Sequence, residues 1–187
     1  MSTIARRRTT FTPDDLLAMP DGKAYELVDG RLMKRNVSNL TSLVGANFST
    51  LLNNHCEPIN LAWVFGADCG YRCFPDRPKK VRRPDVSCVL KSRLTLGQLD
   101  EGFVPVAPDV AVEVISPRDR AYPVDQKVHE YLGAGTRLVW VVLPPSRTVW
   151  VYRADGSGTL VREAGELEGE GVLPGFRCRV GDLFPTE

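Results

Sequence analysis

The sequence predicts a mixed α/β (α+β) fold, in which a central sheet of parallel and antiparallel strands is flanked by a few helices. A continuous apolar run at 109–115 indicates a strand that is buried on both faces. A helical pattern at 123–134 and a second apolar run at 138–143 follow it. Such a βαβ unit is nearly always right-handed, so its two strands should be parallel and close in the sheet. With 187 residues, the chain should form a single domain, residues 1–187.

The composition is that of an ordinary globular protein, with 43% hydrophobic and 25% charged residues. The net charge of +1 excludes a polycation that coats nucleic acid indiscriminately. No apolar run approaches the ~20 residues of a membrane helix, and the N-terminus lacks the apolar core of a signal peptide. We therefore expect a cytoplasmic protein with no membrane partner. Five scattered cysteines argue against a disulfide framework; Cys69 and Cys73 could contribute to a zinc site, but free thiols are favoured.

The elements before the apolar strand begin with a short helix. The sequence Thr12-Pro13-Asp14-Asp15 supplies an N-cap, a proline at the first helical position and acids in the first turn. Residues 25–33 predict a β-hairpin around the tight turn Asp29-Gly30. Apolar residues spaced by three and four predict an amphipathic helix at 39–56. Strands are then expected at 62–66, 71–74 and 81–90.

The elements after the apolar strand are the crossover helix and a series of strands. The helix at 123–134 should end at Gly133-Ala134-Gly135, because glycine readily adopts the left-handed conformation that ends helices. Apolar runs predict strands at 138–143, 148–153 and 159–162, the first two joined by a turn at 144–147. A closing strand at 172–176 and a turn at 180–184 are expected.

One acid, Glu113, interrupts the apolar strand, and a buried carboxylate is costly unless a cation or hydrogen-bond donors compensate it. Asp109 lies four residues upstream, about 13 Å along a strand, which is too far to share one metal ion. Asp85 is a better candidate to share a metal ion with Glu113, because residues on neighbouring strands lie roughly 5 Å apart. Two adjacent carboxylates repel unless they share a proton or a cation, and hard oxygen ligands favour Mg²⁺ or Mn²⁺.

A lysine on the crossover helix should complete this group. Lys127 comes three residues after Val124 and four before Tyr131, so it shares the helix face that turns toward the sheet. Its ammonium could orient a water molecule or stabilise charge on a phosphate. Two acids, a lysine and a divalent metal together form a constellation that can cleave phosphodiesters.

A basic run leads directly into Asp85, where positive charge would meet a nucleic-acid backbone. It comprises Lys79, Lys80, Arg82 and Arg83. The alternative interpretation is a buried Glu113–Lys127 salt bridge beside a merely solvated basic loop. Glu26, in the first arm of the hairpin, is explained equally well as a solvated strand acid.

The order of several short motifs resembles the Uma-two family of the restriction-endonuclease-like, PD-(D/E)XK superfamily. The resemblance spans roughly residues 10 to 185. It rests on Tyr25-Glu26-Leu27-Val28-Asp29-Gly30, on Arg83-Pro84-Asp85-Val86, on 108–117, on Lys127 with 131–135 and 139–142, and on the closing 172–176. It implies a restriction-endonuclease-like core, a divalent metal (Mg²⁺ or Mn²⁺) and nuclease chemistry on DNA.

The resemblance also assigns roles to residues. Asp85 corresponds to the metal-binding aspartate, Glu113 to the acid of the E-x-K element, and Glu26 to an acid from the N-terminal region. Ile115 stands where the usual lysine would, two residues after the glutamate, and Lys127 would replace that lysine from the following helix.

Three hypotheses follow for the function of the chain. The first is a metal-dependent DNA endonuclease, in which a homodimer would let each protomer cut one strand. The second is a catalytically weak or inactive member that binds nucleic acid or a partner protein. The third is a structural interaction protein whose acid–lysine cluster is only a salt bridge.

Overall fold

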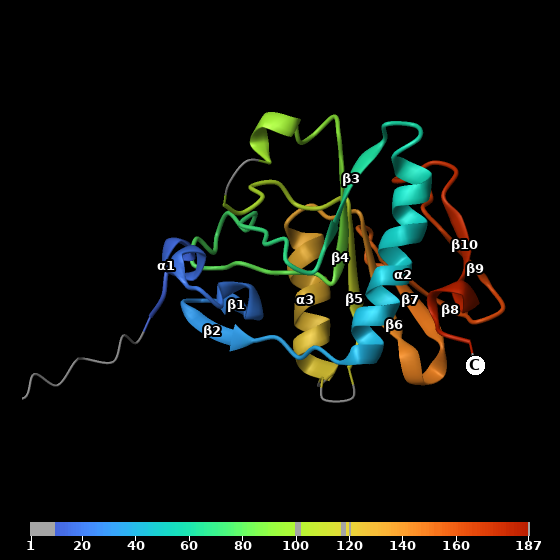
Figure 1. Cartoon of the computed structure of the whole chain (residues 1–187), viewed down its shortest axis with the longest axis horizontal. Helices are drawn as coiled ribbons and strands as arrows, with labels where there is room; N and C mark the ends of the chain where they lie inside the picture. Colours follow the sequence, from blue (N-terminus) through green and yellow to red (C-terminus); the bar gives the residue numbers. More distant parts are fainter. Residues whose placement is uncertain (1–9, 100–101, 117–118, 120, 187) are drawn as a thin grey trace, which may run out of the picture.

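The computed structural model describes residues 10–99, 102–116, 119 and 121–186. Within them, a six-stranded mixed sheet forms the centre of the molecule, with strand order β3-β4-β5-β6-β7-β8 (Figure 1). Its strands are β3 Ala62–Gly66, β4 Val86–Leu90, β5 Val110–Val114, β6 Leu138–Leu143, β7 Thr148–Arg153 and β8 Gly158–Arg162. β5 and β6 are parallel neighbours and the other pairs are antiparallel, so the predicted mixed fold and its βαβ unit are confirmed.

Two long helices cover opposite faces of this sheet. Helix α2, Asn39–Cys56, packs Phe48 and other apolar side chains on a core that includes Val112 of β5. Helix α3, Ala121–Gly133, packs Val128 on a second core that includes Ala111, the preceding residue of the same strand. Because successive side chains of a strand point to opposite faces, α2 and α3 lie on either side of β5. Glu113 shares the face of Ala111, and therefore points toward α3.

The N-terminal elements form a small layer beside α3 (Figure 1). Helix α1, Pro13–Ala18, starts at the predicted N-cap, Thr12, whose side chain accepts a hydrogen bond from the Asp15 backbone N–H. After a 3₁₀ turn at Gly22–Ala24, strands β1 Tyr25–Val28 and β2 Arg31–Lys34 form the predicted hairpin. Leu27 of β1 exchanges backbone hydrogen bonds with Val81. This pairing places the hairpin, and with it Glu26, against the segment that leads into β4.

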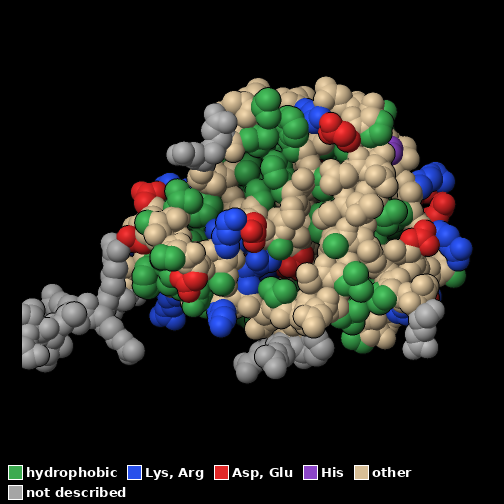
Figure 2. Space-filling model, viewed as in Figure 1, with side chains coloured by type: hydrophobic (Ala, Val, Ile, Leu, Met, Phe, Trp, Pro, Cys, Tyr) green, Lys and Arg blue, Asp and Glu red, His purple; other side chains and the backbone are tan. Residues whose placement is uncertain are grey.

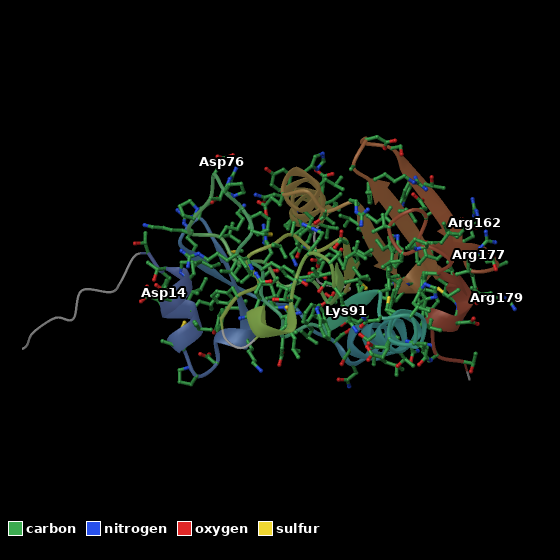
Figure 3. The ribbon with its side chains drawn as sticks, turned by 90° about the horizontal axis from the view of Figure 1, so that it is seen from above. Asp14, Asp76, Lys91, Arg162, Arg177 and Arg179 are labelled. Carbon is green, nitrogen blue, oxygen red and sulfur yellow. The ribbon has the colours of Figure 1, made fainter. Side chains whose placement is uncertain are left out.

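The C-terminal residues cover the α2 side of the molecule. Strands β9 Glu166–Glu168 and β10 Arg177–Arg179 pair with each other outside the main sheet, and a 3₁₀ turn at Val180–Leu183 follows. Seen from above, the side chains of Arg162, Arg177 and Arg179 point outward at the end of the molecule far from the N-terminal helix (Figure 3). Other 3₁₀ turns lie at Leu96–Gln98 and Pro144–Ser146.

Three details of the predicted secondary structure were wrong. Residues 71–74 are not a strand beside 62–66, because β3 pairs with β4 and Tyr71 forms isolated bridges to Arg82 and Val104. The strand expected at 81–90 begins only at Val86, because the bridges at 81–82 join other segments and Pro84 has no N–H for a ladder. The closing strand is Arg177–Arg179 rather than 172–176.

The structure also bears on the cysteines and on a membrane span. Cys69 and Cys73 are free thiols, and no group of three or more His, Cys, Asp or Glu side chains in the described part of the chain is arranged to hold a metal by itself. Across the same residues, no helix has the length and apolar character needed to cross a membrane.

Candidate functional site

Asp85 and Glu113 lie opposite each other at one end of the β4–β5 pair. The antiparallel register matches Val86 with Val112, and continuing it by one residue matches Asp85 with Glu113. Backbone hydrogen bonds fix this geometry: the Asp85 N–H donates to the Val112 carbonyl at 2.9 Å, and the Val114 N–H donates to Asp85 Oδ2 at 2.8 Å. The predicted pairing of two acids on adjacent strands is therefore present.

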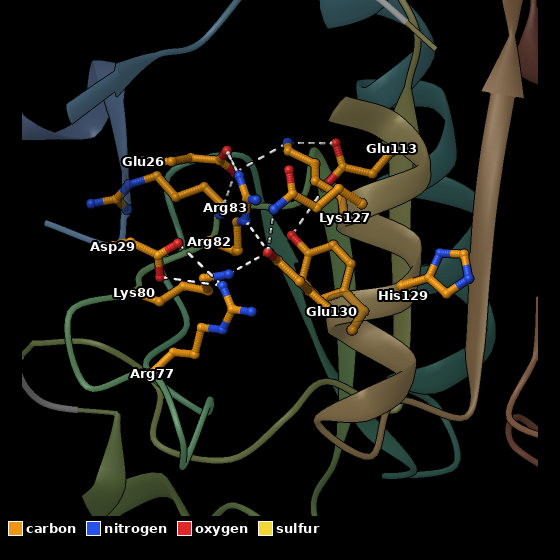
Figure 4. Close-up of polar contacts among 12 residues, drawn as sticks. Glu26, Asp29, Arg77, Lys80, Arg82, Arg83, Glu113, Lys127, His129 and Glu130 are labelled. Atoms are coloured by element: carbon orange, nitrogen blue, oxygen red, sulfur yellow. Dashed lines mark hydrogen bonds and ion pairs between the residues drawn. The ribbon is translucent and has the colours of Figure 1, made fainter. Parts of the chain in front are cut away.

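Lys127 reaches this acid pair from α3, as its helical spacing predicted. Its Nζ lies 2.9 Å from Glu113 Oε2 and 3.1 Å from Glu26 Oε1, so one ammonium bridges two carboxylates (Figure 4). Tyr131, one turn later on α3, donates its hydroxyl to Glu113 Oε1 at 3.1 Å. Both oxygens of Glu113 are thus held by residues of the same helix.

Glu26 belongs to this cluster and is not a solvated strand acid, since it is only 4% exposed. One of its oxygens accepts the Arg83 backbone N–H at 2.9 Å, and the other accepts Arg82 Nη1 at 2.9 Å. Burial alone would raise the pKa of Glu26, but the charges of Lys127 and Arg82 outweigh it and hold that pKa below its ordinary value. Glu26 is therefore an anion that fixes the position of Lys127.

Glu113 and Asp85 have less positive charge beside them than Glu26 has. Burial raises the pKa of Glu113 to about 7 against the pull of Lys127, and the nearby charges of Asp85 and Glu26 add to the rise. Burial likewise raises the pKa of Asp85 above its ordinary value, although Lys127 and Arg35 oppose it. Burial would lower the pKa of Lys127, but Glu113 and Glu26 hold it above its ordinary value, so this lysine is charged. The pair of acids consequently favours any further cation that enters beside it.

The acids face a cavity of about 460 Å³, which the hairpin, the ends of β4 and β5, and the start of α3 enclose. Its lining includes Glu26, Arg35, Asp85, Glu113 and Lys127. A site of this kind fits Mg²⁺ or Mn²⁺, because Mg²⁺ is usually held by one or two carboxylates while water and substrate phosphates complete its shell. Asp85 and Glu113 are the residues that would hold it.

The basic run before Asp85 is mostly buried, whereas the prediction was that it faces the solvent and a nucleic-acid backbone. Lys80, Arg82 and Arg83 are at most 5% exposed, and among the four residues of the run Lys79 alone is exposed. Lys80 and Arg82 both pair with Glu130 of α3, with Arg82 Nε 2.7 Å from Glu130 Oε2. The guanidinium of Arg83 donates to the backbone carbonyls of Tyr25 and Asp68. The run therefore fastens the N-terminal layer to α3 (Figure 4).

Sequence reasoning missed Arg35, which follows β2 and donates from Nη2 to Asp85 Oδ1 at 3.1 Å. The hairpin pattern offered a signal, since β2 returns beside Glu26 and its next residue must lie near the same cavity. Asp109, rejected on distance, has separate partners at the opposite end of β5, with Arg93 and Arg137 each 2.9 Å from its Oδ1.

Known proteins share the sequence pattern and the fold of this chain. The family model Uma2, described as a putative restriction endonuclease, matches residues 13–181. The chain belongs to the Uma2 family. The fold of this Uma2 chain is also that of a crystal structure described as a putative nuclease of the DUF820 group, from Anabaena variabilis. That structure has a TM-score of 0.79 and 22% sequence identity, and the match covers 93% of this chain and 97% of the other. No curated protein matches the chain significantly.

Proposed function

We propose that this Uma2 protein is a metal-dependent nuclease that hydrolyses phosphodiester bonds of DNA. The observation that carries the proposal is the facing pair Asp85 and Glu113, which opens into a cavity beside the charged Lys127. The family description and the shared fold support nuclease chemistry. The metal, the roles of the individual residues and DNA as the substrate are our proposal.

Each side chain has a role that follows from its contacts. Asp85 and Glu113 would hold Mg²⁺ (or Mn²⁺), and the chemistry that such an ion would supply there is polarisation of the phosphate and a lower pKa for the attacking water. Lys127 keeps the Glu113 carboxylate in place and presents a fixed positive charge to the phosphate, where negative charge grows in the transition state. Glu26 positions Lys127 from the opposite side of the cavity.

A second candidate is a catalytically weak or inactive nuclease-fold protein that binds nucleic acid or a protein partner. A specific observation favours it: Lys127 is already shared by two carboxylates, and Asp85 already pairs with Arg35. In that case the same cavity would bind its ligand without cutting it. A structural role without metal binding is the third candidate.

Plasmid cleavage and Mn²⁺ binding, measured on the same proteins, distinguish these candidates. The nuclease proposal predicts that wild-type protein cuts plasmid DNA with Mg²⁺ or Mn²⁺, and that Asp85→Ala, Glu113→Ala and Lys127→Ala abolish cutting. The matched control is Asp125→Ala, which removes an exposed acid from the same helix. Metal binding without cutting under any condition supports the second candidate. Absence of metal binding in the wild type leaves the structural role.

The products of the same assay report on assembly. A duplex has two strands of opposite polarity, so we propose that a homodimer presents one site to each strand. Linear plasmid formed directly from supercoiled substrate is the expected result for such a dimer. Accumulation of nicked circles alone would contradict paired sites.

A further inference from the structure

The cations that line the cavity differ in how far neighbouring carboxylates already neutralise their charge. Arg82 pairs with Glu26 and Glu130, and Lys127 pairs with Glu26 and Glu113. Because each is held by two carboxylates within 3.1 Å, neither attracts a polyanion from solution, and Lys127 acts only at short range on the phosphate that reacts. The cavity also exposes acids to that polyanion, which repel it unless cations at the rim attract it.

The remaining two lining cations, Lys34 and Arg35, are neighbours at the end of β2. Lys34 is exposed, and no carboxylate in the described portion of the chain pairs with it. Arg35 is fixed by its backbone, whose N–H donates to the Ala24 carbonyl at 2.9 Å. Its side chain is only 10% exposed. One of its guanidinium nitrogens binds Asp85, and the other donors have no partner among the residues that the structure describes.

The geometry of Arg35 suits a phosphate. A guanidinium offers several N–H groups in a planar fork that matches two phosphate oxygens. Since one arm of this fork rests on Asp85, a phosphate on the other arm would lie beside the acid pair. Lys34, next in the chain and nearer the solvent, would meet a neighbouring phosphate of the same strand.

We infer that Lys34 and Arg35 are the phosphate ligands of this site, so that the nucleic-acid strand enters along β2 and not across the basic run at 79–83. The inference rests on the proposed function and makes it more specific. It assigns phosphate binding to Lys34 and Arg35 in place of the run at 79–83, because Lys80 and Arg82 of that run already pair with Glu130. On the face of the molecule that Figure 2 shows, Lys and Arg side chains lie scattered among acids and form no broad basic patch.

The salt dependence of DNA binding tests this assignment, because each phosphate contact contributes about one unit to the slope of log K against log salt. The probe is a fluorescent random-sequence duplex, with Ca²⁺ at fixed concentration occupying the oxygen ligands in place of Mg²⁺. Lys34→Met and Arg35→Met should each lower the slope by about 1, while Arg35→Lys should restore the slope because it keeps the charge. Arg162→Met, a matched change at an exposed arginine far from the hairpin, should keep the wild-type slope.

The outcomes separate the inference from the function. An unchanged slope in Lys34→Met and Arg35→Met, with binding otherwise intact, overturns the inference alone. A slope that falls in Lys79→Met, and not in Lys34→Met or Arg35→Met, would show that the 79–83 run contacts phosphate. This result also overturns the inference. Wild-type protein that binds no duplex at any salt overturns both the inference and the proposed function. Lys34→Met keeps the test valid if Arg35→Met misfolds, because Lys34 is exposed and has no ion pair among the described residues.

Discussion

Asp85, the residue directly before β4, lies opposite Glu113 of the antiparallel neighbour β5, and the backbone of Val114 holds Asp85 there through a 2.8 Å hydrogen bond. Desolvation raises the pKa of both acids, and the nearby charge of Asp85 raises that of the buried Glu113 further. Their position at the end of the strands, facing a cavity, gives a cation access to both. The first prediction concerns that cation.

Loss of either acid should abolish metal binding. We expect Asp85→Ala and Glu113→Ala to weaken Mn²⁺ binding by more than the roughly 10- to 100-fold typical of changes outside the first coordination sphere, as measured by calorimetry. Asp109→Asn is the matched control, because Asp109 is a buried acid at the other end of the same β5 region with its own arginines. It should cost stability but leave Mn²⁺ affinity unchanged. Equal loss of affinity in the control would contradict the assignment.

The raised pKa of Glu113 predicts how the stability of the metal-free protein depends on pH. Its folded-state pKa of about 7 exceeds the ordinary 4.5, so between these values the folded state binds more protons than the unfolded state. The Glu113 contribution to the free energy of unfolding is therefore complete below about pH 4.5 and is lost as pH rises through 7. Urea unfolding in EDTA should show a steeper loss from pH 5 to pH 8 in the wild type than in Glu113→Gln. Parallel curves would show that Glu113 titrates normally.

Lys127→Met should destabilise the fold markedly, because it leaves Glu26 and Glu113 buried without their shared ammonium. Removing one partner of a buried ion pair costs about 3–5 kcal/mol in the free energy of unfolding. Lys23→Met, which breaks an exposed pair with Asp68, should cost less than about 1 kcal/mol. Denaturant unfolding of the two variants measures this difference. Equal losses of unfolding free energy in the two variants would mean that the ion pairs of Lys127 stabilise the fold no more than an exposed pair does.

Glu130→Gln should affect stability but not the electrostatics of DNA binding. Glu130 compensates Lys80 and Arg82, so its neutralisation should cost about 2 kcal/mol of unfolding free energy, the scale of a hydrogen bond to a charged group. If the basic run is structural, the salt slope of duplex binding stays at its wild-type value. A slope that rises in Glu130→Gln would indicate that Lys80 or Arg82, once freed, contacts phosphate.

The parts of the site that the sequence predicted are those governed by local periodicity. Strand alternation separates Asp85 from the face of Val86 and Cys88, and helical spacing turns Lys127 toward the sheet. These rules involve short stretches of chain, so they can be applied without a structure. The hairpin and both long helices were predictable for the same reason.

The parts that escaped prediction depend on pairings between distant segments. Lys80 and Arg82 look like a solvated basic run until Glu130, about fifty residues later, is placed beside them. The local pattern fits a surface acid at Glu26 equally well, because its partners, Arg82 and Lys127, come from two other elements; only the family resemblance assigns it to the site. Residues 71–74 have the composition of a strand, but their bridges go to loops instead of to β3.

The most direct test of the central claim is the anomalous signal of manganese in a crystal soaked in Mn²⁺. The proposed nuclease site predicts an anomalous peak between the carboxylates of Asp85 and Glu113, about 2 Å from an oxygen of each. Asp85→Ala crystals soaked in the same way should lack it. No peak in the wild type, or a peak elsewhere with Lys127 still bridging Glu26 and Glu113, would contradict a metal site at this acid pair.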